Sequence, residues 1–285
     1  MEIKCVSGFS FTARKWVIKD RRLLANRRLA KGGRFFTTML ERAALEVTNP
    51  GPYSRFMKPG DKPNFSGVAW PDIMDALLQI RQHMNDQIDF SETCQADGCS
   101  APLRPEDHHT LSSLKRQPPS QRGLRFLETG EPIGFSFRGD AFEGGGVDIY
   151  LKVIRGEDIP TMFKWQGERQ RAAALTSDDG GAGRAADAMV CLQIDKVVIP
   201  ASGKVLEEMD ELLEWYGEQD WELQSKLEEL VDELTGGVDT TLGVECPACG
   251  HYNELPLPFD MHFFYPKKME SSTLSVSEIG STATP

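Results

Sequence analysis

The sequence predicts an α+β fold with helical N- and C-terminal parts and a small middle region that contains a β-hairpin. Three observations support this prediction. Apolar side chains recur at helical spacing over 34–47 and 71–84, and again over 203–235. Phenylalanines and aliphatic residues alternate with other residues within 124–155, which is typical of strands. Two cysteine pairs far apart in the sequence are each flanked by residues that favour strands.

The N-terminal part begins with residues 1–19, where aromatic residues alternate with polar ones and short strands are expected. Asp20 is placed to cap a helix over 21–31, which two glycines end. An unbroken i, i+4 apolar stripe predicts a second helix over 34–47. Proline and glycine then predict a loop over 50–69, and Pro71 suits the first turn of a helix over 71–84.

The middle of the chain starts with a polar stretch, 104–123, that we interpret as a linker or exposed loop. Strands are expected over 124–155, joined by a glycine-rich turn at 140–146. A short helix is expected near 159–165. Residues 171–187 are poor in bulky side chains, which predicts a mobile loop.

The C-terminal part opens with residues 188–199, an apolar run that fits a buried strand or a buried helix equally well. Ser202 and Asp220 can each cap an amphipathic helix, and together the two helices predict a helical hairpin. The Ser/Thr-rich residues 267–285 lack a core pattern and are expected to be a disordered tail. The resulting regions are 1–103, 104–123, 124–187, 188–266 and 267–285.

Composition excludes several classes of protein. The 285 residues carry 32 basic and 43 acidic side chains, a net charge of −11 that argues against general nucleic-acid coating. The charge is uneven: residues 1–42 hold eleven basic and three acidic side chains, whereas 206–233 hold twelve acidic and one basic. Opposed blocks of this kind suggest docking faces, although solvated helix faces are the commoner explanation.

The sequence also lacks targeting and membrane signals. The sequence contains no run of 18 apolar residues, so it does not predict a transmembrane helix. The first ten residues lack the pattern of a secretory signal. Six cysteines in 285 residues are too sparse for a disulfide scaffold. We therefore expect the protein to be located in a reducing cytosol. In that compartment, paired cysteines indicate a metal site more often than a disulfide.

The strongest chemical signal is the run Cys246-Pro-Ala-Cys249-Gly250, because C-x₂-C is the spacing with which one tight turn offers two thiolates to Zn²⁺. The glycine lets the turn reach positive φ and exposes N–H groups to the sulfurs. Cys94 and Cys99 form a second, C-x₄-C pair. We therefore predict a Cys₄ zinc ribbon that is split across the sequence and joins the two helical parts, with 146 residues between its halves.

Alternatives to this site remain open at the level of sequence. A lone C-x₂-C can be redox-active, but the strand-then-helix context of thioredoxin-like sites is missing here. His251, His108 or His109 could replace one cysteine as a ligand. Cys5 and Cys191 have no partner in sequence and are expected to be free thiols. No catalytic constellation is recognisable, so the sequence predicts a protein that is not an enzyme.

Several stretches, taken in order, resemble a known family. They are Asp20–Arg28 (DRRLLANRR), Asn49–Tyr53 (NPGPY), Trp70, Leu78–Arg81 (LQIR), Gly237–Thr241 (GVDTT), Cys246–Gly250 (CPACG), Leu255–Phe259 (LPLPF) and Phe263–Pro266 (FFYP). With them the chain resembles the T-even-type baseplate hub assembly proteins of contractile-tail bacteriophages. The resemblance covers roughly residues 5–100 and 190–266, and its C-terminal stretches are the most specific. Asn85-Asp86 departs from the family, in which an aromatic-glycine pair is common at this point.

The resemblance implies a structural or assembly role without enzymatic activity, and metal-binding cysteines that match Cys94, Cys99, Cys246 and Cys249. The expected location is the virion tail baseplate, or the host cytoplasm during assembly. The expected partners are other baseplate, hub or tail-tube proteins, with no membrane and no small-molecule substrate.

The aromatic residues beyond the second cysteine pair suggest where a partner binds, because aromatic side chains dominate buried interface hot spots. These residues are Phe259, Phe263, Phe264 and Tyr265. Packing on the ribbon is the simpler explanation for them. Two other functions are considered: a zinc-ribbon nucleic-acid-binding protein, which the basic N-terminal block favours and the acidic block opposes, and a metallo-hydrolase with an open coordination position.

Overall fold

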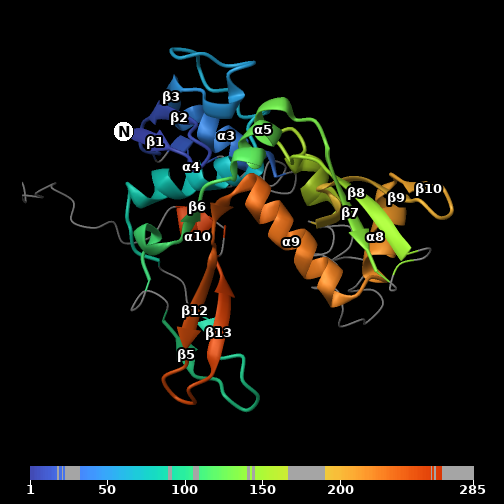
Figure 1. Cartoon of the computed structure of the whole chain (residues 1–285). Coiled ribbons are helices and arrows are strands. Elements are labelled where there is room, and N and C mark those ends of the chain that lie inside the picture. Colours follow the sequence, from blue (N-terminus) through green and yellow to red (C-terminus); the bar gives the residue numbers. More distant parts are fainter. Residues whose placement is uncertain are drawn as a thin grey trace, which may run out of the picture.

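The computed structural model describes most of the chain. The described residues are 1–17, 19–20, 22, 33–88, 92–104, 109–139, 142, 145–165, 190–257, 259 and 261–264. Most of the helix predicted over 21–31, the segment 171–187 and the tail 267–285 lie outside them. Within the described residues the fold is α+β, with α-helices and several small antiparallel sheets (Figure 1).

The N-terminal part starts with strands and mixes them with helices, so the prediction of a helical part is wrong for this end of the chain. It starts with β1 (Glu2–Lys4) and β2 (Ser10–Ala13), and β3 (Ala44–Asn49) completes a three-stranded antiparallel sheet in the order β1-β2-β3. Helix α3 (Arg34–Ala43) lies between β2 and β3 in the sequence. The short strands expected within residues 1–19 are therefore confirmed.

The helix predicted over 34–47 is too long, because the chain becomes extended at Ala44 and pairs with β2. Val47 is buried, as its place in the apolar stripe suggests, but it is buried as part of a strand. Its N–H donates to the carbonyl of Asp61 at 2.8 Å, a contact remote in sequence that periodicity does not reveal. The long-range pairing of this segment therefore overrides its helical pattern.

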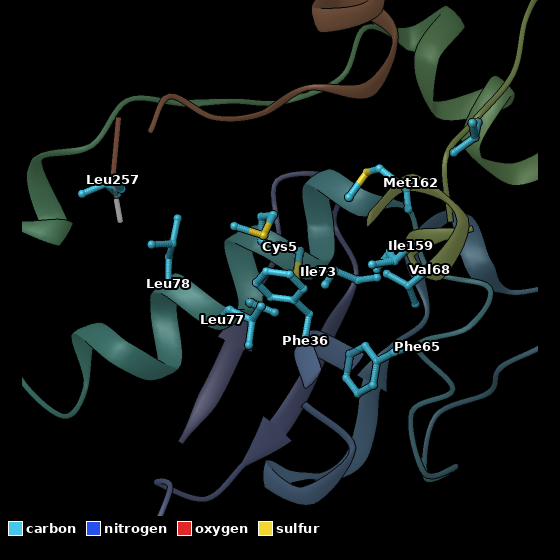
Figure 2. Packing of buried hydrophobic residues seen from close by; sticks show 14 of the residues in the cluster. Cys5, Phe36, Phe65, Val68, Ile73, Leu77, Leu78, Ile159, Met162 and Leu257 are labelled. Atoms are coloured by element: carbon cyan, nitrogen blue, oxygen red, sulfur yellow. The ribbon is translucent and has the colours of Figure 1, made fainter. Parts of the chain in front are cut away.

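Helix α4 (Trp70–Gln82) confirms the helix predicted over 71–84 and runs through the core. Every residue from Asp72 to Arg81 is buried, so the helix is enclosed on all sides. Figure 2 shows Ile73, Leu77 and Leu78 of α4 among apolar side chains that come from distant parts of the chain. A short 3₁₀ turn (η1, Gly51–Tyr53) brings the buried Tyr53 against the same core.

The middle region holds a four-stranded antiparallel sheet in the order β10-β9-β8-β7. Its strands are β7 (Ile133–Arg138), β8 (Gly146–Leu151), β9 (Ile194–Ile199) and β10 (Lys204–Leu206). The expected hairpin is confirmed as β7–β8. Within the run 188–199, for which strand and helix were both open, residues 194–199 form β9, whereas Val190 and Cys191 are helical. The helix expected to follow Ser202 begins only at Met209, because β10 comes first.

Helix α5 (Gln121–Thr129) stands where a strand was expected to begin. The Ser120 hydroxyl accepts a hydrogen bond from the Gly123 N–H and caps the helix, and Gly130 ends it in the left-handed region. Before α5, the stretch interpreted as a linker contains a 3₁₀ turn (η3, Leu111–Ser113) and strand β6 (Arg116–Gln117).

The C-terminal part mixes helices with strands, so the prediction of a helical part is wrong here too. Helices α8 (Met209–Gly217) and α9 (Trp221–Thr235) form the expected pair, and Asp220 caps α9. They are followed by β11 (Gly237–Val238), which pairs with β6, by the hairpin of β12 (Thr241–Glu245) and β13 (Tyr252–Pro256), and by helix α10 (Met261–Phe264).

An arm extends from the body of the molecule. The β12–β13 hairpin forms it, and β5 (Pro102–Leu103) lies at its side, paired with β4 (Glu92–Thr93) (Figure 1). At the other end of the arm, β11 and α10 connect it to the body. In the part of the chain that the structure describes, no helix is both long and apolar enough to cross a membrane.

Candidate metal centre

The first cysteine pair lies in the turn between β4 and β5. Its backbone is fixed by hydrogen bonds at both cysteines: the Cys94 N–H donates to the Ala101 carbonyl at 2.9 Å and the Cys99 N–H to the Ala96 carbonyl at 3.0 Å. Gly98 has a φ of 75°, which lets the chain turn back directly before Cys99. The C-x₄-C spacing therefore closes as one compact knuckle.

The second pair lies in the turn of the β12–β13 hairpin. The Cys246 N–H donates to the His251 carbonyl at 2.8 Å, and the Gly250 N–H donates to the Cys246 carbonyl at 2.9 Å. Gly250 has a φ of 73°, the left-handed conformation expected from the glycine that follows Cys249.

The fold brings the two knuckles face to face. The Sγ atoms of Cys94 and Cys249 are 3.6 Å apart, and those of Cys99 and Cys246 are 3.8 Å apart. All four Sγ atoms lie within 4.8 Å of one another. A tetrahedral Zn²⁺ with bonds of about 2.3 Å to four thiolates places the sulfurs about 3.8 Å apart. The four cysteines thus form a cluster that could hold a metal ion.

Histidine does not belong to this cluster in the described part of the chain. His251 is exposed and contributes its carbonyl to the knuckle, while the His109 Nε2 lies 2.9 Å from the carbonyl oxygen of Gly243 on β12. His108 lies outside the described residues. Cys5 and Cys191 are buried and lie outside the cluster. The Cys5 thiol donates to the Asp72 carbonyl, and the Cys191 thiol donates to the Leu212 carbonyl.

The electrostatics of the cluster favour a cation. The backbone N–H of Ala248 hydrogen-bonds the Cys246 sulfur and lowers the pKa of Cys246 to about 7. The pKa of Cys249 is raised to about 12: the His251 N–H acts to lower it, but burial and the neighbouring thiols raise it. One thiolate is therefore stabilised locally, whereas further thiolates repel one another unless a positive ion lies between them.

Asn253 connects the two knuckles and was missed by the sequence analysis. Its Oδ1 accepts a hydrogen bond from the Gln95 N–H at 2.8 Å, and its Nδ2 donates to the carbonyls of Val244 and His251. The side chain is 1% exposed. One sequence signal could have found it: Asn253 lies on the same face of β13 as the apolar Leu255. A polar side chain on such a face is expected to be buried, and a buried amide needs hydrogen-bond partners. Such outer contacts orient metal ligands.

The aromatic run of the C-terminus packs on the N-terminal core. Phe264 is fully buried and its ring lies 5.6 Å from Trp16 and 6.2 Å from Phe35, centroid to centroid. Phe263 is also buried, and Phe259 is half-buried 5.4 Å from its ring. Tyr265 lies outside the described residues. The rings of Phe263 and Phe264 thus stabilise the chain's own fold and offer little surface to a partner.

Searches against family models, curated proteins and solved structures give no match to this chain. The resemblance to baseplate hub assembly proteins therefore stays a prediction from the sequence.

Proposed function

We propose that this protein is a non-enzymatic structural or assembly component of the hub region of a contractile bacteriophage tail baseplate, with a fold closed by one structural Zn²⁺. The observation that carries the proposal is the cluster of Cys94, Cys99, Cys246 and Cys249, whose Sγ atoms converge within 4.8 Å from two distant segments. Four thiolates fill a tetrahedral zinc site and leave no position for water, so the ion acts as a clamp and not as a catalyst.

The chemistry of the cluster supports zinc as the ion. Cysteine is the only ligand type in it, and thiolates suit Zn²⁺, whereas the hard ions Mg²⁺ and Ca²⁺ prefer oxygen ligands. The surrounding N–H groups and Asn253 supply the outer support that such sites need. Bound zinc would join the β4–β5 turn to the β12–β13 turn and thereby fix the two hairpins of the arm to each other.

The baseplate role rests on the resemblance of the sequence. Its most specific stretches fall on β11, the second knuckle and α10, which are the segments that build the arm and attach it to the body. A role in assembly agrees with this use of the motifs, because they shape a projecting element and attach it to the body. The proposed partners are other baseplate, hub or tail-tube proteins, in the virion or in the host cytoplasm during assembly.

Quantitative mass spectrometry of purified tails from the phage that encodes this chain tests the role. We expect a fixed copy number per particle that is a multiple of three or six if the protein is a subunit. If it is an assembly chaperone, we expect it to co-purify with tail proteins from infected cells and to be missing from particles. Absence from both fractions, or DNA binding that falls steeply with added salt, would contradict the proposal.

A further inference from the structure

A cavity of about 510 Å³ lies in the body of the molecule, where α3, α4, α9 and β11 meet residues 159–165. Its apolar walls include the large side chains Phe35, Phe36, Trp70, Met74, Met162, Phe163 and Phe259. Thr240, which also lines it, precedes β12, so the cavity lies at the opposite end of this strand from the cysteine cluster. Neither the metal centre nor the proposed clamp makes use of this cavity.

The aromatic wall is well defined. The Phe36 ring packs edge-on against Trp70 at 5.2 Å and lies 5.5 Å from Phe163, centroid to centroid. Phe36 is buried, whereas Trp70 and Phe163 are half-buried and leave part of their surface open to the cavity. Gly237, which has a φ of 145°, also lines the cavity and contributes only backbone atoms to its wall. The volume falls in the range of sites that bind ligands or side chains, roughly 300–1,000 Å³.

One side of the cavity carries negative charge. Asp232, in the last turn of α9, lines this side and also lines an adjoining cavity of about 270 Å³ together with Asp239 and Lys115. No basic residue occupies the last turn of α9, although a helix C-terminus favours cations. Partial burial, and secondarily the nearby Asp239, raise the pKa of Asp232. Two carboxylates, those of Asp232 and Asp239, therefore line this region together with one lysine.

We propose that this cavity docks a segment of a partner protein that presents an apolar side chain directly beside a lysine or arginine. The apolar side chain would fill the aromatic part and exclude water from it. The neighbouring cation would lie against Asp232 and the C-terminal end of α9, where it relieves the repulsion from Asp239 and complements the helix dipole. This requirement for adjacent apolar and basic groups sets the specificity of the site.

The probe for this proposal is the dipeptide N-acetyl-phenylalanyl-lysine amide, compared with its norleucine analogue, which keeps the alkyl chain and lacks the ammonium group. Binding is followed by NMR at the Trp70 indole signal, which the Trp70→Phe variant assigns. Asp232→Asn removes the charge at the cavity, and Glu233→Gln is the matched control, because Glu233 is exposed on the same turn and does not line the cavity. Unfolding midpoints confirm that both variants are folded.

We expect the lysine peptide to shift the Trp70 signal and to bind about fivefold more tightly than the norleucine peptide. Asp232→Asn should abolish this preference, and Glu233→Gln should keep it. Absence of a Trp70 shift in the wild-type protein would overturn the proposal, as would a lysine preference that Asp232→Asn leaves unchanged or that both variants lose equally. The test needs no phage particle, so its failure is separate from failure of the proposed function.

Discussion

Arg81 of α4 contacts Phe263 of α10 in two ways, across 182 residues of sequence. Its Nε donates a hydrogen bond to the Phe263 carbonyl, and its guanidinium lies 5.5 Å from the centroid of the Phe263 ring. The other guanidinium nitrogens donate to the carbonyls of Asn85 and Gln87. Arg81 is 1% exposed, so a single buried cation fixes the C-terminal helix on the N-terminal core.

Replacing this arginine is expected to be costly. Arg81→Met keeps much of the apolar stem but leaves three carbonyls without their donor, so we expect the free energy of unfolding to fall by about 3–5 kcal/mol. Chemical denaturation measures the change. Arg125→Met, on the exposed side of α5, is the control and should change stability by less than about 0.5 kcal/mol. A loss at Arg81 no larger than the loss at Arg125 would refute this role.

The contact between α5 and α9 depends on a glycine. A Cβ atom at Gly123 would lie 2.1 Å from the Leu234 carbonyl oxygen, so alanine must push the two helices apart. Alanine normally gains about 0.5–1 kcal/mol over glycine within a helix, but overpacking of this kind costs about 1–3 kcal/mol. We therefore expect Gly123→Ala to lower the thermal midpoint.

Gly217→Ala is the matched control for that variant, because Gly217 ends α8 and a Cβ there meets nothing within 4 Å. We expect its thermal midpoint to stay the same or to rise. If Gly123→Ala were as stable as Gly217→Ala, the close approach of α5 and α9 would be wrong.

Asp72 makes the stability depend on pH. Its carboxylate is 2% exposed and accepts hydrogen bonds from the hydroxyls of Ser7 and Tyr53. Burial outweighs these bonds and raises the pKa of Asp72 to about 6. The folded state therefore holds the proton more tightly than the unfolded chain, in which the pKa is about 3.9. The contribution of Asp72 to stability is full below about pH 4 and is lost as the pH rises through about 6.

We expect this loss to amount to at most about 3 kcal/mol and to be missing in Asp72→Asn, which cannot titrate. Urea unfolding between about pH 4 and pH 7 measures it as the difference between wild type and variant. Glu41→Gln, an exposed change on α3, should keep the wild-type pH profile. A difference between wild type and Asp72→Asn that does not vary with pH would exclude Asp72 as the source.

The features predicted from the sequence are those set by local chemistry. The spacing within each cysteine pair and the glycine after Cys249 predicted both knuckles, and the fold brings them together. The apolar stripe of α4 and the Asp220 cap of α9 likewise act within one helix. Such signals do not depend on the rest of the chain, which explains why single-sequence reasoning finds them.

The features that sequence reasoning missed depend on distant partners. Ala44–Asn49 is a strand because β2 lies beside it. Arg81 and Asn253 are polar residues on buried faces, and only the folded chain supplies their partners. Phe263 and Phe264 were predicted to bind a partner protein, but nothing in their sequence distinguishes that role from packing on the N-terminal core.

The central claim, that four cysteines close this fold around zinc, is tested most directly by the metal content of the purified full chain. Elemental mass spectrometry should find one zinc per chain, and Cys94→Ser or Cys246→Ser should lower both the zinc content and the thermal midpoint. Cys191→Ser, a buried thiol away from the cluster, should keep the zinc. Wild-type protein without zinc after growth in zinc-supplemented medium, or a Cys94→Ser variant with undiminished zinc, would contradict the account.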